Sequence, residues 1–587
     1  MRIPVRPAPC TNSAYALLMT LCVVAAIALT LATMATWTRT SSMITSRNNN
    51  YMSTVGAAEA ATEAVIAQMD ADFLHQALTS DVTRYCAILP STFVTDPWVS
   101  QYAFNDGNGN WGQTAVSCSS WQVWTNLASE FVGLYGLANS FQITSYAAQT
   151  NATFPVTMGV SQNIQLSTIP VFQFAIYYSL DMEINPGAPM TVTGKAHSNM
   201  NLYAAPPSTL TFLDAVSAVG QIYNNRDPND PTGGGSTMPI FESTHLSQVS
   251  SLTLPIGVNN NPTNVIAILD TPPPGEDPHS QLGSQRYYNQ ADLVVLVSSN
   301  AVQVNYNVYE DGTLFTQVAT NAWPGSGSSG YTFLNTNLSF YDYREDKQVQ
   351  GTELNVGALT NWLATTGASL NQTAQTQLGH PINSVYINDM RSGSSSRLTA
   401  VRVANGQYLP SGGLSVATPQ PLYVKGDFNA PNLTAGSTNM SGVLPASFAC
   451  DAITVLSANW NDSWTSSTSL GSRNPVNTTV NAAVMAGIVP SVTVGGVGHY
   501  SGGVENFFRL LENWSGDTLT YNGSIVAMYA SRYGTNFWIN TGTYYNAPTR
   551  KWAFDANFLS ESGLPPCTPQ VRKLQRVSWN VVAPTAP

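Results

Sequence analysis

The chain has 587 residues, more than one hydrophobic core usually organises, so we expect more than one structural unit. Only 9% of the residues are charged, whereas 43% are hydrophobic and 10% aromatic, which excludes a largely disordered chain and predicts β-rich structure with an uncharged polar surface. The net charge of −11 argues against a nucleic-acid-binding protein, because neutralising phosphates requires clustered Lys and Arg.

The strongest signal is an apolar segment near the N-terminus. Residues 14–37 carry no charge, and a helix of that length crosses a hydrocarbon core of about 30 Å. Arg2 and Arg6 precede the segment while Glu59 and Glu63 follow it, so we expect a cytoplasmic N-terminus. A cleaved secretory signal is the alternative, but its apolar region is usually about 7 to 15 residues long and ends at an A-x-A-like site, which is missing near Trp37.

Beyond Trp37 the helical pattern continues, and no Pro occurs between Pro9 and Pro90. Residues at spacings of three, four or seven mark one face: Ile44, Tyr51, Val55, Ala58, Thr62, Val65, Met69 and Phe73. We expect one rod within residues 14–85, helical to about residue 79 and roughly 100 Å long. Its first half is hydrophobic all round, which suits lipid or the core of a filament of sister helices. Its second half is amphipathic, which suits packing on a globular head.

The segment Ala14-Tyr-Ala-Leu-Leu-Met-Thr-Leu, with Arg47-Asn-Asn-Asn-Tyr51 and Ala57-Ala-Glu-Ala-Ala-Thr-Glu63 further on, resembles the N-terminal helix of PilX-type minor pilins and type IV pilus assembly-like proteins. The resemblance implies a minor pilin or pseudopilin that acts in pilus assembly, capping or adhesion. It also implies three kinds of partner: the membrane, other pilin-like subunits reached through the N-terminal helix, and surface glycans or proteins. The implied location is a bacterial inner membrane with the ectodomain outside the cytoplasm, or a pilus or cell surface.

In that family a leader peptidase cuts after a Gly, and many members carry a Glu five residues into the mature helix. Here Ser13 stands at the Gly position and Leu18 at the Glu position. The resemblance therefore places cleavage between Ser13 and Ala14, with residues 1–13 as a cytoplasmic leader. Without cleavage, the same residues form the cytoplasmic tail of a static anchor.

Residues 86–440 are expected to form a β-rich ectodomain. Apolar side chains alternate over residues 172–184, which indicates one half-buried strand or two joined strands. Short strand-like pieces follow at residues 190–193, 200–203, 209–212 and 215–219, separated by Gly, Asn or Pro. Such steps of roughly ten residues favour a β-solenoid, and a β-sandwich with long loops is the alternative. Residues 169–178, 192–199, 501–507 and 511–516 also resemble uncharacterised ectodomains attached to PilX-like helices.

Residues 441–587 are expected to form an α+β part, so the fold class is α+β and mainly β. One predicted helix contains Ile453, Leu456 and Trp460, and another contains Phe507, Leu510, Leu511 and Trp514. A strand is predicted over residues 519–529. We expect Tyr544, Tyr545 and Trp552 in the core, and Arg572, Lys573 and Arg576 on a solvated strand face.

Cysteine and histidine placement predicts no metal site. Cys10 and Cys22 lie before or in the apolar segment, whereas Cys86, Cys118, Cys450 and Cys567 allow one or two disulfides in an oxidising compartment. The six histidines are scattered, and no CxxC occurs. Asp106-Gly-Asn-Gly-Asn110 lacks the Gly and Glu of a calcium loop and is read as a turn, as is Val494-Gly-Gly-Val-Gly-His499. The run that starts at Asn225 and ends at Gly235 is read as a flexible loop.

No nucleophile elbow, Walker loop or dinucleotide fingerprint occurs in the chain, so we predict no catalytic residue and no cofactor. The expected function is that of an anchored, pilin-like surface protein. One alternative is a static membrane-anchored adhesin or glycan-binding protein. A second is a surface β-helix polysaccharide-degrading enzyme, which requires paired carboxylates. The carboxylates considered for that role are Asp427, Asp451, Glu505 and Glu512, and no spacing brings them together.

Overall fold

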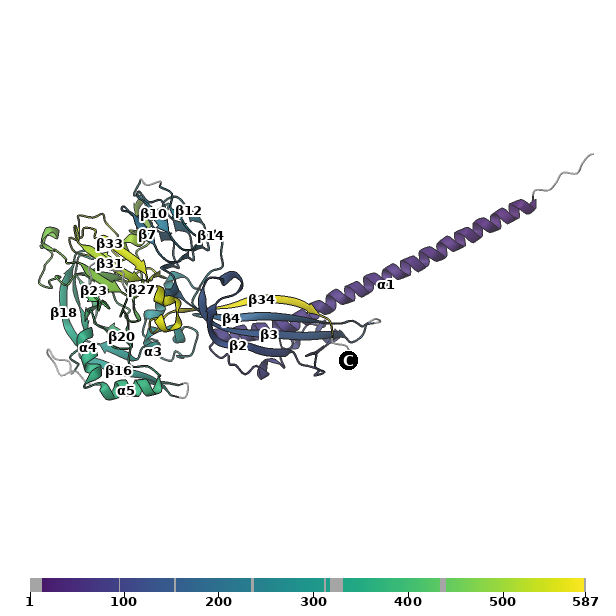
Figure 1. Cartoon of the computed structure of the whole chain (residues 1–587), viewed down its shortest axis with the longest axis horizontal. Helices are drawn as coiled ribbons and strands as arrows, with labels where there is room; N and C mark the ends of the chain where they lie inside the picture. Colours follow the sequence, from purple (N-terminus) through teal and green to yellow (C-terminus); the bar gives the residue numbers. More distant parts are fainter. Residues whose placement is uncertain are drawn as a thin grey trace, which may run out of the picture.

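The computed structural model describes residues 13–93, 95–152, 155–233, 237–310, 313–316, 331–432 and 440–584. Apart from Ser13, the expected leader therefore lies outside the described residues. Figure 1 shows three parts in line: a long helix, a narrow sheet against which the helix ends, and a broad β-rich head.

The N-terminal helix α1 is a single uninterrupted rod, Ser13–Leu74, of 62 residues. At 1.5 Å per residue it is about 93 Å long. Residues 15–49 are exposed, whereas the expected contact residues from Val55 to Phe73 are buried. The rod and its amphipathic second half are thus confirmed, with two differences. The helix ends at Leu74, and Ile44 and Tyr51 are 55% and 39% exposed because they lie before the point where the helix meets the sheet.

The second half of α1 packs on an antiparallel sheet, which we call the stalk sheet. Its strands are β1 (Tyr102–Asn105), β2 (Ala115–Asn126), β3 (Tyr135–Gln149), β4 (Thr157–Pro170) and β34 (Gln570–Val582). β1 and β2 pair with successive parts of β3, β3 pairs with β4, and β4 pairs with β34. The last strand of the chain therefore completes a sheet begun by the first strands, and the head is an insertion between β4 and β34 (Figure 1).

The head is dominated by one twelve-stranded sheet in which all neighbours from β14 to β15 are parallel. We call residues 176–247 the early segment. It contributes β5 (Ile176–Tyr178), β8 (Ala196–Ser198), β11 (Val216–Ala218) and β14 (His245–Ser247). Ile176 pairs with Ala196, and Ala196 with Val216, so consecutive turns of chain stack 20 residues apart.

Each turn of the early segment also crosses two small parallel sheets. One contains β6 (Met182–Glu183), β9 (Leu202–Tyr203) and β12 (Ile222–Tyr223), and the other contains β7 (Met190–Val192), β10 (Leu210–Phe212) and β13 (Ile240–Phe241). Equivalent side chains stack from turn to turn: the rings of Tyr203 and Tyr223 lie 5.1 Å apart, and those of Phe212 and Phe241 lie 5.3 Å apart. The predicted strand pieces of this region are therefore present as β7, β9, β10 and β11.

We call residues 293–554 the late segment. In the twelve-stranded sheet it supplies β15 (Leu293–Val297), β20 (Ser384–Asp389), β22 (Leu414–Ala417), β24 (Ala446–Cys450), β27 (Ala483–Ala486) and β32 (Ile525–Ala527), followed at the edge by antiparallel β16 (Val302–Glu310) and β17 (Thr313–Thr316). A nine-stranded sheet contains β18 (Leu334–Asp342), β19 (Lys347–Asn355), β21 (Arg397–Gly406), β23 (Leu422–Phe428), β25 (Ile453–Leu456), β26 (Thr478–Asn481), β30 (Arg509–Leu510), β31 (Thr518–Gly523) and β33 (Thr549–Phe554). The helices α2 (Pro262–Val265), α3 (Tyr287–Gln290), α4 (Val356–Ala364) and α5 (Ala368–Gln377) and the hairpin β28 (Val492–Val494) and β29 (Val497–His499) complete the head.

The two segments stack end to end in the twelve-stranded sheet, where the last strand that the late segment supplies meets the first strand of the early segment. β32 of the late segment pairs in parallel with β5 of the early segment, Ile525 opposite Ile176. We call this junction the seam. The early segment forms one end of the head around β10 and β14, and the other end lies around β16 and α5 (Figure 1). The chain consequently enters the head at its middle, from β4, and returns from its middle to β34.

Both helices predicted in the C-terminal part are wrong. Residues 453–456 form β25, and the second region contains only a 3-10 turn, Val504–Asn506, and β30. All four residues of β25 are buried, so an apolar run that has helix-like spacing is in fact a strand covered on both faces. The strand predicted over residues 519–529 is interrupted at Ser524, and its two parts, β31 and β32, belong to different sheets.

Stacked aromatic rings should carry much of the stability of the early segment. Phe212 is fully buried beside Phe241, so Phe212→Ala should lower the free energy of unfolding by about 3–5 kcal/mol, since it leaves a cavity between two turns. The matched control is Leu213→Ala, because Leu213 is the next residue and is 49% exposed. Near-UV circular dichroism during thermal unfolding of the purified chain measures both. Equal effects of the two variants would contradict the stacked arrangement.

Candidate functional site

The first half of α1 is an apolar surface that nothing in the described structure covers. Leu17, Val24, Ile27 and Leu31 are each between 52% and 71% exposed. Among the described residues α1 is the one helix long and apolar enough to cross a membrane, with a mean hydropathy of 2.4 in its most apolar window.

The threonines of this half do not break its apolar character. The hydroxyls of Thr20, Thr30, Thr33 and Thr36 donate hydrogen bonds of 2.8–3.0 Å to backbone carbonyls three or four residues earlier. Polar groups bonded within the helix need no water. The rod surface is therefore compatible with lipid or with the interior of a helix bundle.

Two residues of the basic cluster of β34 bond to the helix. Arg576 is exposed, as expected for a solvated strand face, whereas Arg572 and Lys573 are half-buried. Arg576 forms an ion pair with Glu63, with 2.7 Å between Nη2 and Oε2. Burial raises the pKa of Glu63, but hydrogen bonds from Arg576 and Gln162 outweigh it and leave that pKa below its ordinary value. Arg572 donates a 2.8 Å bond to the last carbonyl of α1, on Leu74, and burial lowers its pKa to about 10.

A pocket in the head, which we call the acidic pocket, lies at the seam. Carboxylates from separate turns of the chain line it. It has a volume of about 160 Å³. Its lining residues are Ser179, Leu180, Asp181, Glu183, Met200, Asp227, Asn229, Pro262, Pro490 and Ser491. Asp181 and Glu183 come from the first turn of the early segment, Asp227 from the loop after β12, and Ser491 from the late segment. The stacking of the two segments therefore builds this pocket.

Glu183 is the central acid of the pocket. It is 4% exposed, and its Oε1 accepts hydrogen bonds from the hydroxyls of Ser491 and Ser501 at 2.6 and 2.9 Å. Its Oε2 is buried and has no hydrogen-bond partner among the described residues. Burial raises the pKa of Glu183 to about 8, and the negative charges of Asp227 and Asp230 add to the rise against the two serine bonds. Glu183 is thus a carboxyl group with one unused acceptor.

The loop from residue 225 is more ordered than the sequence suggests over its described part, residues 225–233. Arg226 pairs with Asp230 at 2.6 Å, Asp230 accepts a bond from the backbone N–H of Thr232, and Asp227 accepts one from that of Asn229. This loop brings Asp227 to the acidic pocket. The predicted turn at Asp106 is confirmed, because its carboxylate accepts bonds from the N–H groups of Asn108 and Asn110. The turn predicted from Val494 is likewise present, between β28 and β29.

The carboxylates considered for catalysis are engaged separately. Asp427 accepts the backbone N–H of Thr479, Glu512 accepts both the N–H and the hydroxyl of Ser457, and Glu505 accepts the Tyr500 hydroxyl. Of these four acids, none lines the acidic pocket.

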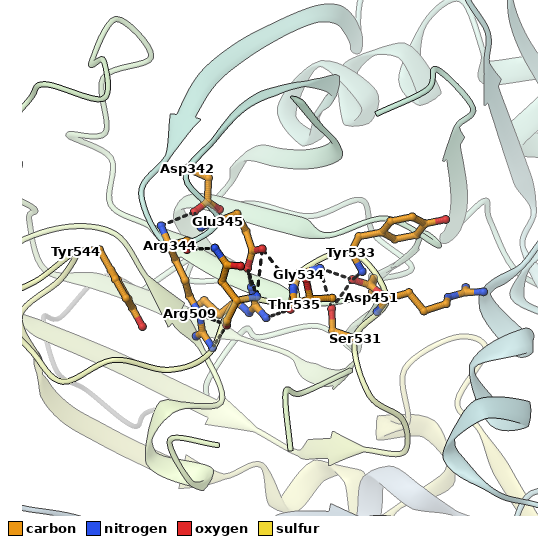
Figure 2. A network of polar contacts seen from close by, with 12 residues as sticks. Asp342, Arg344, Glu345, Asp451, Arg509, Ser531, Tyr533, Gly534, Thr535 and Tyr544 are labelled. Atoms are coloured by element: carbon orange, nitrogen blue, oxygen red, sulfur yellow. Dashed lines mark hydrogen bonds and ion pairs between the residues drawn. The ribbon is translucent and has the colours of Figure 1, made fainter. Parts of the chain in front are cut away.

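The fourth, Asp451, belongs to a buried charge network, which Figure 2 shows. Its carboxylate accepts the Ser531 hydroxyl and the backbone N–H groups of residues 532–534 at 2.5–3.1 Å. In the same network Arg509 pairs with Glu345 at 2.5 Å and also donates to the carbonyl of Gly534. Each acid is satisfied by N–H or hydroxyl donors or by Arg509, so this network anchors the loop after β32.

Cysteines and histidines are dispersed. Cys22, Cys86, Cys118, Cys450 and Cys567 all carry free thiols, so the predicted disulfides are absent from the described structure. Cys450 lies in the head core, and the thiol of Cys567 donates to the carbonyl of Gln290 at 3.6 Å. His197 stacks on Tyr177, and burial lowers its pKa to about 4. Across the described residues, no group of three or more His, Cys, Asp or Glu is placed to hold a metal ion.

The buried glutamates should make the head less stable at higher pH. Burial raises the pKa of Glu183 to about 8 and those of Glu505 and Glu512 to about 7, well above the ordinary value of 4.5. The folded chain binds these protons more tightly than the unfolded chain does. The contribution of these groups to the free energy of unfolding is therefore largest below pH 4.5 and is lost as the pH rises through 7 and 8.

Glu183 alone should cost on the order of 2 kcal/mol of unfolding free energy between pH 6 and pH 8. Urea midpoints of the wild-type chain and of Glu183→Gln at both pH values test this, since the variant should lose that part of the pH dependence. Glu242→Gln, at an exposed position of the early segment, should keep it. An unchanged pH dependence in Glu183→Gln would contradict the raised pKa.

No family model, no curated protein and no solved structure matches the chain.

Proposed function

We propose that the chain is a membrane-anchored, pilin-like surface protein whose head is a β-solenoid. The observation that carries the proposal is the division of α1 at about residue 50. Its first half is bare and apolar, and its second half packs on a sheet that the two ends of the ectodomain build together. In this proposal the first half of α1 lies in a bacterial inner membrane or packs among sister helices. The second half of α1 holds the head outside the cytoplasm.

The packing between helix and sheet explains how such a rod carries a large head. Val65, Met69 and Phe73 of α1 form a buried cluster with Phe141 and Ile164 of the stalk sheet. The Arg576 ion pair with Glu63 and the Arg572 bond to Leu74 join the final strand to the same helix. A force on the rod is thereby transmitted to β4 and β34, the two strands through which the chain enters and leaves the head. A rigid link of this kind suits a subunit that primes or caps a filament, or an adhesin that projects from the cell.

The stacked turns support the solenoid part of the proposal. A repeat of 20 residues, three parallel sheets and ladders of aromatic rings are the features expected of a β-solenoid. A solenoid has a long side wall, which suits binding to extended surface glycans or proteins. Pilus assembly, capping and adhesion are the roles that this shape serves at a cell surface.

The membrane role is tested by charges placed in the rod. Val24→Asp combined with Ile27→Asp should remove the full-length chain from carbonate-washed membranes, because each acid near the middle of a membrane helix costs about 2.5–3.5 kcal/mol. Met52→Asp is the matched control, since Met52 is 67% exposed on the same helix beyond the apolar half and should not affect membrane retention. Immunoblots of washed membranes measure all three chains. Retention of the double variant would contradict a membrane-spanning rod.

The mature N-terminus separates a filament subunit from a static anchor. Intact-mass measurement of the chain purified from bacterial membranes should give a start at Ala14 if it is processed as a pilin-like subunit. A start at Met1 would show a static membrane-anchored adhesin or glycan-binding protein instead. A start beyond Trp37 would mean that the apolar half is removed, and would overturn the proposal.

A further inference from the structure

The acidic pocket lacks a positive charge of its own. None of its lining residues is Lys or Arg, although three of them are carboxylic acids. Arg226, on the loop that carries Asp227, is paired with Asp230 and also donates to the Thr232 hydroxyl. Burying acids together without a cation is costly, and the buried Oε2 of Glu183 has no partner in the described structure. The pocket is therefore poised to accept a cation.

We propose that the acidic pocket binds a primary alkylammonium group, the chemistry of a lysine side chain, with the Glu183 carboxylate as its main acceptor. Asp181 and Asp227 line the same pocket and add negative charge to it. An ammonium group has three donors and needs acceptors only at hydrogen-bond distance. This site is separate from the rod, so the inference holds whether or not the chain enters a filament.

The walls of the pocket favour an aliphatic stem behind the ammonium group. Leu180, Met200, Pro262 and Pro490 supply apolar surface beside the acids. A volume of about 160 Å³ leaves room for the four methylenes and one nitrogen of a lysine side chain. Lysine ordinarily buries its stem on apolar surface in this way and leaves its head on polar groups.

A metal ion fits the pocket less well. Calcium requires six to eight oxygen ligands at 2.3–2.6 Å, and no group of three acids or histidines in the described residues is placed to surround one ion. The second cavity beside Glu183 has a volume of about 10 Å³, room for a single water, so it does not accommodate an organic cation. The larger acidic pocket is therefore the site for the ligand.

Binding should release a proton. Glu183 holds its proton more tightly than an ordinary acid, and a neighbouring cation would favour the charged form. The early segment places Asp181, Asp227, Asp230, Arg226 and Tyr178 around Glu183. The late segment adds Glu505, Tyr500, Arg509 and Arg344. Arg344 and Arg509 are already bonded to Asn536 and to Glu345 respectively, so they do not replace the ligand.

Calorimetry of the full-length chain in detergent tests the proposal with Nα-acetyl-lysine amide as the probe. We expect saturable binding at pH 7 with close to one proton released, measured in two buffers of different ionisation enthalpy. Glu183→Gln should weaken binding at least tenfold and abolish the proton release, because Gln keeps the shape but not the charge. Glu242→Gln, exposed on the same segment, should bind as the wild type does.

Three comparisons can overturn the proposal. If the lysine amide acetylated on Nζ binds equally well, the ammonium group is not what the pocket recognises. Tighter binding of glucosamine than of the lysine probe would assign an amino sugar instead, and competition by millimolar calcium would assign a metal ion. Thermal midpoints of wild type and Glu183→Gln should agree at pH 5.5, where Glu183 is protonated, so a loss of binding cannot be attributed to misfolding if they do.

Discussion

The architecture depends on the pairing of β34 with β4 beneath the second half of α1. Thirteen residues at the end of the chain, Gln570–Val582, must reach a strand that ended 400 positions earlier, at Pro170. That constraint makes the entire head an insertion with neighbouring ends. It also explains why the chain enters and leaves the head at the seam and not at its tips. The first and last parts of the head are held together there by β5 and β32.

The basic residues of β34 help to hold this strand in place. The Arg576 pair with Glu63 and the Arg572 bond to Leu74 attach this strand to the helix as well as to its neighbour. The acidic pocket is a further consequence, since residues of the early and late segments line it together only when the segments stack at the seam.

Local patterns in the sequence predicted much of this structure. The spacing of Val55, Ala58, Val65 and Phe73 identified the packed face of α1, and the short apolar pieces after residue 190 identified the strands of the early segment. Helix-like spacing at Ile453 was misleading because it also occurs by chance in strands that are buried on both faces. The order in which the two segments stack could not be predicted, because the pairing of strands as far apart in the sequence as β5 and β32 leaves no pattern in the sequence.

The same limit applies to the candidate site. Asp181 and Glu183 stand close in sequence, but Asp227 reaches them only through the stacking of turns within the early segment, and Ser491 only across the seam. One signal was present: the turn that contains Asp227 is longer than the 20-residue turns before it, and insertions in repeats often form binding loops. The role of Arg572 and Arg576 was missed because their partners lie near the other end of the chain.

Hydrogen–deuterium exchange of the full-length chain in lipid bilayers tests the central claim most directly. The account predicts two slowly exchanging stretches in α1, residues 15–37 protected by lipid and residues 54–73 protected by the stalk sheet, with faster exchange between them. Residues 570–582 should share the slow exchange of the second stretch. Fast exchange of residues 54–73 in the intact protein would contradict it, because the rod would then not be joined to the sheet that carries the head.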